Sequence, residues 1–360
     1  MRILYVLENY HPHIGGVETL FRQLSTTLAR AGHQVTVVTS RHPDRKADSV
    51  QYPSDPVVIE VPTRNRYLYT LLAPFYAYKQ ATSHDIIHTT SYNAAPAARI
   101  AARLARIPDV ITFHEVWGQL WTELPYISWL SAKLHQAFER WIVGLEHHQF
   151  VAVSNSTKEA LLAHSVPIDQ VTTIYNGLDG AYAPLRASSE SDYFLYYGRS
   201  GYSKGLDLLI DCIDKGIWPK GPTLKIITKD DGGAVYRRAK QCAEKYPAIL
   251  SLHDPVPKAI LHDHIRSAIA VVIPSYSEGF CFVAAETVQL GVPIVHSGKA
   301  ALGEVVSGKH IAMKQHSPEG LAEALEGAVA QMWTFTPTRR FALTECVQSY
   351  LQLYDKLLDQ

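Results

Sequence analysis

The sequence predicts an α/β protein made of two doubly wound Rossmann-like domains that face each other across a cleft. Short runs of β-branched and aromatic residues alternate with amphipathic helical segments, and the alternation occurs twice along the 360 residues. The runs are apolar at successive positions, which is typical of parallel strands covered by helices on both faces. A stretch rich in Gly, Ser and Pro, "NGLDGAYAPLRASSESD", separates the two series and is a good linker.

The first series opens with a strand over Ile3–Leu7, a glycine-containing loop and a helix from about Val17 to Ala31. Four further apolar runs, each followed by helical sequence except the first, predict the remaining strands. They are "QVTVVTS", "DIIHTT", "DVITFH" and "FVAVS", at residues 34–40, 85–90, 109–114 and 150–154. Ligands of such sheets bind outside the carboxyl ends of the strands, so we expect the site at these ends.

The second series begins at Asp192 with "DYFLYYGR" and continues with "TLKIIT", "ILSLH", "AIAVVIPS" and "PIVHS". We place the boundary near residues 180–191, which gives domains of residues 1–182 and 183–340. The last segment, about 341–360, predicts a helix that packs back on the first domain. Its apolar stripe consists of Phe341, Cys346, Tyr350, Leu353 and Leu357.

Bulk composition excludes several classes of protein. Lys plus Arg and Asp plus Glu number 34 each, so no strong positive field indicates a nucleic-acid partner. Four widely spaced cysteines show no metal or disulfide spacing and favour a cytoplasmic location. The N-terminus does not read as a signal peptide, and no run reaches the roughly 18 apolar residues of a membrane span.

Gly15 and Gly16 lie between the first strand and the first helix. Glycines there let backbone N–H groups approach a ligand at the helix N-terminus, although a plain strand-to-helix turn is equally compatible. His114 ends a predicted strand and is a candidate donor to a substrate oxygen. Because the chain has 17 histidines, any one of them is weak evidence, and His88 is a competing candidate on a neighbouring strand.

Arg199 and Lys204 follow the first strand of the second series and are separated by small residues, with a helix starting near Lys204. Two cations beside a helix N-terminus can clamp a diphosphate and stabilise it as a leaving group without a metal. The alternative is a pair of solvated basic residues on a loop.

Glu278 falls in a Ser/Gly loop, and Glu286 falls inside the apolar helix that follows. A buried acid is costly unless it is hydrogen-bonded, and the hydroxyl groups of a sugar would supply such bonds. We therefore expect the two acids to hold separate groups of hydroxyls on one extended ligand. The alternatives are a polar turn residue and an acid that faces solvent.

At this point the stretch "EGFCFVAAE", Glu278 to Glu286, resembles the E-x-seven-E motif of the retaining family 4 glycosyltransferases of group 1, which have the GT-B fold. Other segments resemble the same family in the same order: "GGVE" at 15–18, "FH" at 113–114, "VSNSTK" at 153–158, "IYNGLD" at 174–179, "YYGRSGYSKG" at 196–205 and "GVPIV" at 291–295. The resemblance implies transfer of a sugar, with retention, from a nucleotide diphosphate to an acceptor hydroxyl.

The resemblance also implies the role of each matching residue. Arg199 and Lys204 would grip the donor diphosphate, Glu286 would bind the ribose hydroxyls, and Glu278 would lie near the transferred sugar. His114 would lie near the sugar and the scissile bond. The remaining positions would act mainly through their backbones, near phosphates and acceptor or near the sugar hydroxyls: Gly15, Gly16, Gly279, Phe280 and Cys281.

The family implies metal-independent catalysis with no cofactor, a donor such as a UDP- or GDP-sugar, and a sugar, polysaccharide or lipid-linked acceptor. The chain departs from the family at Gly232 and Gly233, displaced behind Asp230 and Asp231, and at Asp254, and these changes concern the base of the donor. A non-catalytic nucleotide-sugar-binding regulatory protein and a nucleotide-sugar epimerase of the same fold are the alternatives.

A peripheral membrane contact, at the inner face of the membrane, is a further expectation. The stretch "TRNRYLYTLLAPFYAYK" at 63–79 mixes basic, aromatic and aliphatic residues, as membrane-interface segments do. A long helical stretch after His114 is expected to carry four tryptophans, Trp117, Trp121, Trp129 and Trp141. Packing in the core or between the domains is the alternative.

Overall fold

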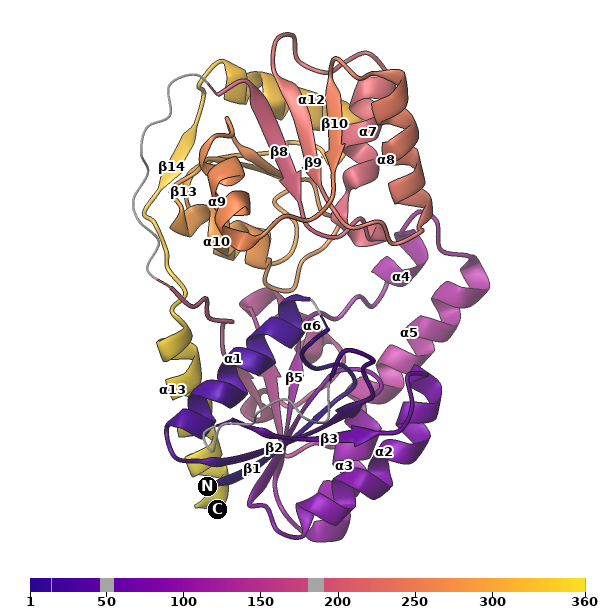
Figure 1. The fold of residues 1–360 in the computed structure, drawn as a ribbon, viewed down its shortest axis with the longest axis vertical. Coiled ribbons are helices and arrows are strands. Elements are labelled where there is room, and N and C mark those ends of the chain that lie inside the picture. The colour runs from indigo at the N-terminus through magenta and orange to yellow at the C-terminus, as the bar shows by residue number, and fades with distance from the viewer. Residues whose placement is uncertain (14, 46–54, 181–190, 360) are drawn as a thin grey trace. The chain divides into compact units, whose positions relative to one another are not determined.

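The computed structural model describes residues 1–13, 15–45, 55–180 and 191–359 (Figure 1). The chain divides into two compact units. Unit 1 comprises Met1–Trp121, Leu130–Asp179 and Phe341–Gln360, and unit 2 comprises Thr122–Trp129 and Gly180–Arg340. The expected boundary at residues 182/183 lies outside the described residues.

Unit 1 is built on a seven-stranded parallel sheet. Its strands, in spatial order, are β3 (Val57–Val61), β2 (Gln34–Ser40), β1 (Arg2–Leu7), β4 (Ile86–Thr90), β5 (Asp109–Phe113), β6 (Gln149–Ala152) and β7 (Val171–Thr173). The strand order reverses at β1, so β1 and β4 form the switch point where doubly wound sheets bind ligands. The sequence did not predict β3 and β7, the two edge strands.

The helices of unit 1 cover both faces of this sheet. They are α1 (Gly16–Arg30), α2 (Arg66–Ala81), α3 (Ala95–Ala105), α5 (Trp129–Val143), α6 (Asn155–Ala163) and α13 (Leu343–Leu358). The short helix α4 (Leu120–Glu123) straddles the division between the two units. Residues of α2 and α3 share one buried cluster with β1, β2 and β4, whereas α1 and α13 contact each other. Right-handed crossovers place α2, α3 and α5 on one face and α1 on the other.

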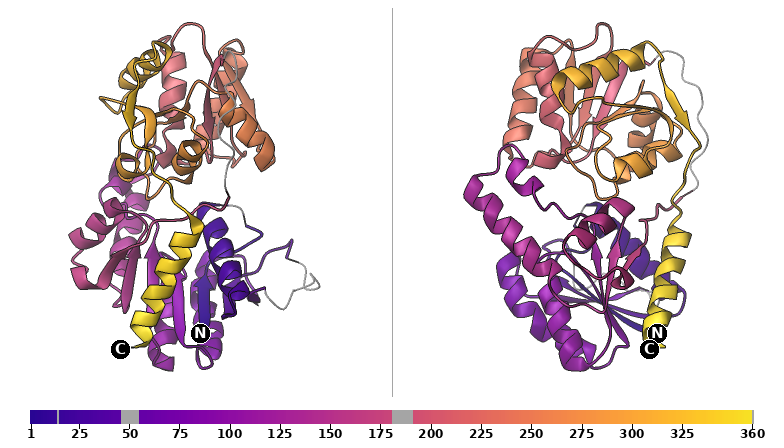
Figure 2. Two further views of the ribbon diagram at one scale, coloured as in Figure 1. Left: turned by 90° about the vertical axis from the view of Figure 1, so that its left-hand side faces the viewer. Right: turned by 180° about the vertical axis from the view of Figure 1, so that it is seen from behind.

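The C-terminal helix α13 packs on unit 1, and both chain ends lie at the same end of this unit (Figure 2). The Tyr354 hydroxyl lies 2.5 Å from His88 Nδ1, and the Tyr350 hydroxyl lies 3.0 Å from Thr112 Oγ1. His88 is fully buried inside β4. It is therefore a core residue that ties α13 to the sheet, and it does not compete with His114 as a site residue.

One residue of the predicted C-terminal stripe, Phe341, lies outside the helix. Phe341 is buried but precedes the helix, because its carbonyl accepts a hydrogen bond from the Leu178 N–H (2.9 Å) where the chain returns to unit 1. Leu357 is only half-buried, because it lies in the last turn of α13.

The stretch after His114 is not one long helix. A loop carries Trp117, the short helix α4 carries Trp121, and α5 carries Trp129 and Trp141. Thr122–Trp129 belongs to unit 2, where the Tyr126 ring stacks on Tyr202. The chain therefore passes from unit 1 to unit 2 within α4 and returns to unit 1 at the start of α5.

Unit 2 repeats the architecture with one difference at an edge. Its strands, in spatial order, are β10 (Leu250–His253), β9 (Thr223–Ile227), β8 (Tyr193–Tyr197), β11 (Val271–Ile273), β12 (Ile294–His296), β13 (Gly308–Ala312) and β14 (Thr334–Thr336). β14 is antiparallel to β13, and the other pairs are parallel. The helices are α7 (Leu206–Asp214), α8 (Ala234–Lys245), α9 (Lys258–Arg266), α10 (Phe282–Gln289), α11 (Leu302–Val305) and α12 (Pro318–Val329).

The fold prediction is confirmed for two Rossmann-like sheets with helices on their faces. Within the described ranges, no helix combines the length and the apolarity needed to cross a membrane. All four cysteines are free and buried.

Candidate functional site

The candidate donor residues of unit 2 lie on two loops at the switch point of the second sheet. β8 and β11 are neighbours in the sheet although β9 and β10 lie between them in the sequence. The loop after β8 carries Arg199 and Lys204, and the loop after β11 carries Glu278. Parallel neighbouring strands end at the same edge, which brings the two loops together.

Gly205 lets these two loops touch. Its φ of +69° lies in the left-handed region, and a Cβ there would stand 2.0 Å from the Pro274 carbonyl oxygen. The Tyr276 N–H also donates to the Ser203 carbonyl at 2.8 Å. A residue with a side chain at position 205 would have to push the loops apart, so glycine sets the distance between the basic loop and the acidic loop.

Lys204 and Glu278 form an ion pair. Lys204 Nζ lies 2.9 Å from Glu278 Oε2, and the Ser275 hydroxyl donates to Glu278 Oε1 at 2.8 Å. Glu278 is only 8% exposed, so its charge is stabilised by these donors rather than by bulk water. The structure thus brings together one cation and one acid that the sequence had singled out separately.

Arg199 is exposed on the same loop, and its carbonyl accepts a hydrogen bond from the Tyr196 hydroxyl at 2.7 Å. Among the described residues, no acid forms an ion pair with its guanidinium. The neighbouring Ser200 hydroxyl donates to Asp231 at 2.7 Å. Asp230 and Asp231 lie in an exposed loop, in which they accept the Gly232 and Gly233 N–H groups.

Cys281 begins α10 in a left-handed conformation, with φ +72°. It follows Gly279 and Phe280 at the end of the acidic loop, and burial raises the pKa of its thiol well above the ordinary value. In the described structure no side chain caps the start of α10. The first N–H groups of a helix lack partners within the helix, so this backbone can donate to a ligand oxygen.

Glu286 lies one turn into α10 and is half-buried. The Tyr197 hydroxyl, at the end of β8, donates to its Oε2 at 3.1 Å, and His262 Nε2 from α9 lies 3.0 Å from its Oε1. Lys258 Nζ lies 3.9 Å from the same oxygen. The acid therefore belongs to a polar cluster that three elements build, rather than facing solvent.

Sequence reasoning did not identify Ser275, Tyr197 or His262 as parts of this cluster. Ser275 lies three residues before Glu278, and Tyr197 lies two residues before Arg199. Their closeness to these candidate residues in the sequence could have indicated that they belong to the cluster. His262 comes from a helix with no motif of its own. Only the fold brings it to Glu286.

His114 lies in unit 1, directly after β5, at the carboxyl edge of the first sheet. Its Nε2 is buried and has no hydrogen-bond partner among the described residues. Burial lowers the pKa of His114 to about 4, so the ring is neutral near pH 7. A neutral imidazole with a buried nitrogen atom can form a hydrogen bond to a ligand, which is how a polar group of this kind is satisfied.

Gly15 and Gly16 lie at the start of α1. Gly15 has an extended backbone (φ −177°), so its conformation does not require glycine. A Cβ at Gly15 would instead collide with the carboxylate of Glu18, which folds back over this position. An acid there suits the positive end of the helix dipole, and it already occupies space in which an anionic ligand group would bind.

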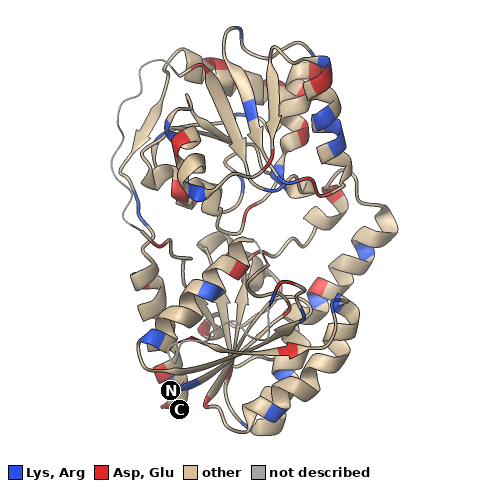
Figure 3. Cartoon of the chain, viewed as in Figure 1, with Lys and Arg blue, Asp and Glu red and all other residues tan. Residues whose placement is uncertain are grey.

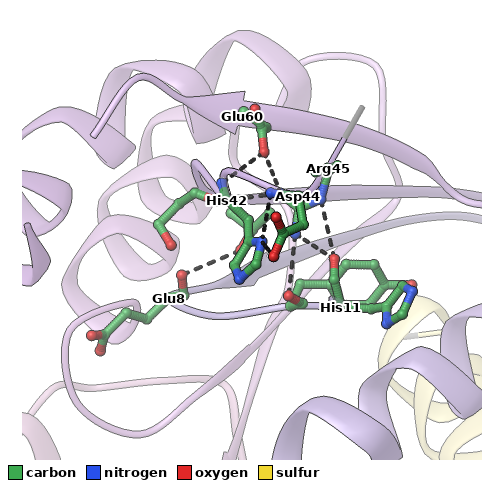
Figure 4. Close-up of polar contacts among 9 residues, drawn as sticks. Glu8, His11, His42, Asp44, Arg45 and Glu60 are labelled. Atoms are coloured by element: carbon green, nitrogen blue, oxygen red, sulfur yellow. Dashed lines mark hydrogen bonds and ion pairs between the residues drawn. The ribbon is translucent and has the colours of Figure 1, made fainter. Parts of the chain in front are cut away.

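A polar network that the sequence analysis missed lies beside this loop in unit 1 (Figure 4). Arg45, after β2, donates to Glu60 of β3 at 2.7 Å, to the Tyr10 carbonyl at 3.1 Å and to the His11 carbonyl. The His42 N–H donates to the same Glu60 oxygen at 3.0 Å. The network joins the loop after β1 to the loop after β2. The similar segments "HPH" at 11–13 and "HPD" at 42–44, each shortly after its strand, could have indicated these polar loops.

In the described part of the chain, no group of three or more His, Cys, Asp or Glu side chains is arranged to hold a metal ion.

Two family models match the chain. Residues 14–181 match Glycosyltransferase Family 4, and residues 191–331 match Glycosyl transferases group 1. Together they cover both units, so the resemblance seen in the motifs extends over most of the chain.

Curated relatives align along nearly the whole length. A phosphatidylinositol N-acetylglucosaminyltransferase protein from Arabidopsis thaliana is 24% identical, over 94% of this chain and 76% of that protein. Glycogen synthase from Mycobacterium tuberculosis is 28% identical, over 85% of this chain and 80% of that protein.

Solved structures share the fold. Sucrose-phosphate synthase from Thermosynechococcus elongatus superimposes with a TM-score of 0.80 and 18% identity, covering 100% of both chains. The Anabaena HepE protein in complex with UDP superimposes with a TM-score of 0.75 and 16% identity, covering 99% of this chain and 100% of that one. With both family models matched and two Rossmann-like sheets in place, the chain belongs to the group 1 glycosyltransferases of the GT-B fold, with a family 4 N-terminal half.

Proposed function

We propose that this chain is a retaining glycosyltransferase that moves a sugar from a nucleotide diphosphate to an acceptor hydroxyl. The observation that carries the proposal is the Lys204–Glu278 pair at the switch point of unit 2, with Arg199 exposed on the same loop. A cation and an acid held side by side suit the two parts of such a donor, the anionic diphosphate and the sugar with its hydroxyls.

Lys204 and Arg199 bind the diphosphate and stabilise the charge that gathers on it as the glycosidic bond breaks. An ammonium has three N–H donors, so Lys204 can serve Glu278 and a phosphate oxygen together. Glu278 accepts from a hydroxyl of the transferred sugar, and the backbone of Gly279, Phe280 and Cys281 donates to the same sugar.

Glu286 binds the ribose hydroxyls of the donor. A carboxylate offers about four acceptor positions, so Tyr197, His262 and a ribose can share it. His114 of unit 1 supplies its unpartnered Nε2 to the sugar or the scissile oxygen. Gly15 and Gly16 form the loop near phosphates and acceptor, where Glu18 has to move aside for an anionic group.

The reaction forms one glycosidic bond and breaks one. The acceptor hydroxyl attacks the anomeric carbon from the side of the leaving group, and its proton passes to the departing phosphate oxygen. This route needs no carboxylate beneath the opposite face of the sugar, which a covalent double displacement would require. It also needs no metal, so we propose catalysis that survives chelation by EDTA.

The donor that we propose is a UDP-sugar, because the similar HepE structures contain UDP and UDP-glucose. A GDP-sugar is the alternative. Names of the relatives include a phosphatidylinositol N-acetylglucosaminyltransferase, a D-inositol 3-phosphate glycosyltransferase and a glycogen synthase. Lipid-linked, small sugar-like and polysaccharide acceptors are therefore the three classes to test.

A thermal-shift panel of nucleotide sugars, followed by turnover with a pool of acceptors, tests the proposal. The true donor raises the melting temperature by mass action, and a product whose anomeric configuration matches the donor, read by NMR, supports retention. Binding without turnover on any acceptor class would favour a regulatory protein. Conversion of the donor without any acceptor would favour an epimerase, and an inverted product would overturn the retaining mechanism.

A further inference from the structure

The helices α2, α3 and α5 form one layer on a single face of the unit 1 sheet. The α2 and α3 residues that face the sheet share a buried cluster with β1, β2 and β4. Ala95 of α3 shares a second buried cluster with Ile142 and Val143 of α5. We call the side of this layer that faces away from the sheet the outer face.

Helix α2 carries large apolar residues on the side that faces away from the sheet. Its fully buried residues are Tyr69 and three alanines at helical spacing, at positions 73, 77 and 81, while Leu72 and Tyr76 pack partly buried against the same cluster. On its other side, Leu68, Leu71, Phe75 and Tyr78 follow the same spacing and are exposed, Leu71 by 76% and Phe75 by 70%. A helix that is apolar all round needs an apolar partner on both sides.

The two neighbouring helices extend the outer face. Helix α3 adds Ile100 and Leu104, which are exposed one turn apart. Helix α5 adds Leu130, Leu134 and Trp141, all more than half exposed. Single exposed apolar residues are ordinary, but large ones on three helices of one layer mark an interaction surface.

The charge of the outer face identifies its partner. Lys79, Arg103, Lys133 and Arg140 on these helices are exposed. Figure 3 colours the basic and acidic residues of the chain. The three helices contain a single acid, Glu139. It is buried and accepts hydrogen bonds from the Trp117 and Gly118 N–H groups, so it does not offset the positive charge outside.

A hollow at the C-terminal end of α3 adds further cations to this region. Arg99, Arg103, Arg106 and His148 line it, and Arg99 and His148 also contact the buried carboxylate of Asp109. Arginine side chains in such a cluster suit phosphate groups, which they bind with paired N–H donors.

We propose that the outer face of α2, α3 and α5 docks on the surface of an anionic lipid bilayer. The leucines, Phe75 and Trp141 enter the interface between headgroups and acyl chains, and the lysines and arginines contact lipid phosphates. The stem of a lysine or arginine lies along apolar surface while its charge stays at the headgroups. This docking is separate from the proposed chemistry, because the residues that carry it are not those of the candidate site.

A second copy of this chain fits the same surface less well. A two-fold interface would place the same patch against itself, so the four exposed cations would face four more with no exposed acid from these helices between them. An anionic bilayer satisfies the apolar and the basic side chains together.

Flotation with vesicles of phosphatidylcholine, with and without abundant phosphatidylglycerol, tests the docking on the full chain. We expect binding to the anionic vesicles that falls in high salt. The double variant Leu71→Gln/Phe75→Gln should lower the partition coefficient at least about tenfold. Each of Lys79→Gln and Arg103→Gln should lower it about fivefold, and only for the anionic vesicles.

Ile168→Gln is the matched control, because Ile168 is also in unit 1 and is 67% exposed but lies outside the outer face. It should bind vesicles as the parent chain does. A variant enters the comparison of vesicle binding only if its melting temperature equals that of the parent chain. Its turnover of the donor with a water-soluble acceptor must also be unchanged. Absence of vesicle binding, equal binding by the double variant, or equal binding to neutral vesicles would overturn the proposal. So would a dimer in light scattering that the double variant makes monomeric.

Discussion

Lys204 Nζ and Glu278 Oε2 stand 2.9 Å apart, although 74 residues separate them in the chain. The pair exists because β8 and β11 are neighbours at the switch point and because Gly205 lets their loops meet. The two charges satisfy each other in the ligand-free chain. A bound diphosphate would therefore share the Lys204 ammonium with Glu278.

Lys204→Ala should slow sugar transfer by about a thousandfold, which corresponds to about 4 kcal/mol of lost transition-state stabilisation. Steady-state kinetics with the donor found in the binding panel measures it. Lys215→Ala is the matched control, since Lys215 forms an exposed ion pair with Glu319 in the same unit and should leave the rate unchanged. A near-normal rate for Lys204→Ala would remove the clamp from the mechanism.

The same variant should also lose stability, because it leaves the Glu278 carboxylate buried without its cation. Adding Glu278→Gln should restore most of the melting temperature, since a neutral amide needs no counter-charge, while turnover stays low. A double-mutant cycle of melting temperatures measures this coupling. Purely additive effects would show that the pair has no energetic role.

Glu286→Gln should raise the KM for the donor about tenfold to a hundredfold, the usual worth of hydrogen bonds to a charged group, with a smaller change in kcat. The 2′-deoxy form of the donor provides the sharper test. Parent enzyme should lose affinity for it, whereas the variant should discriminate little between the two donors. Glu319→Gln, an exposed acid of the same unit, serves as control. If the variant and the parent discriminate equally between the two donors, Glu286 does not bind the ribose.

Gly205→Ala should destabilise unit 2 far more than Gly216→Ala. Both glycines have φ +69°, so both substitutions lose about 1–2 kcal/mol to left-handed strain. A Cβ at Gly216 meets nothing within 4 Å, but a Cβ at Gly205 meets the Pro274 carbonyl. Chemical denaturation measures the free energy of unfolding that each variant loses. The loss for Gly205→Ala should exceed the loss for Gly216→Ala by at least twice the latter. Equal losses would mean that the loops separate without cost.

Acid should weaken unit 1 through His88. Burial, and then the nearby His114, lower the pKa of His88 to about 3 from an ordinary value of 6.5. Below pH 6.5 the unfolded chain therefore binds a proton that the folded chain excludes, and the free energy of unfolding falls by up to about 1.4 kcal/mol per pH unit. This stability is fully present above pH 6.5 and is lost toward the folded pKa.

Urea denaturation at several pH values between neutral and mildly acidic measures that slope. His88→Gln keeps a polar side chain but cannot be protonated, so its slope should be shallower even if the variant is less stable at neutral pH. An unchanged slope would assign the acid sensitivity to other groups, such as His114 and His296, whose pKa values burial also lowers.

Sequence predicted the central strands well because they are buried on both faces and so read as continuous apolar runs. The missed strands lie at or next to sheet edges, where this signal fades: β3 and β14 are mostly exposed or half-buried, and β13 is exposed or half-buried throughout. The positions of Arg199, Lys204, Glu278 and Glu286 relative to strand ends followed from motif spacing. Their distant partners did not, because His262 reaches Glu286, and Lys204 reaches Glu278, only through tertiary structure. The contact of Ser275 with Glu278 is local, three residues away in the same loop.

Helix α13 has a consequence for how such a chain can be divided or recombined. Its tyrosine hydroxyls complete the hydrogen bonds of His88 and Thr112, yet it follows the whole of unit 2 in the sequence. A fragment ending in the linker would leave an imidazole and a strip of aromatic core facing water. Hybrids made by swapping halves between relatives therefore need to inherit their final twenty or so residues from the parent that supplied the beginning.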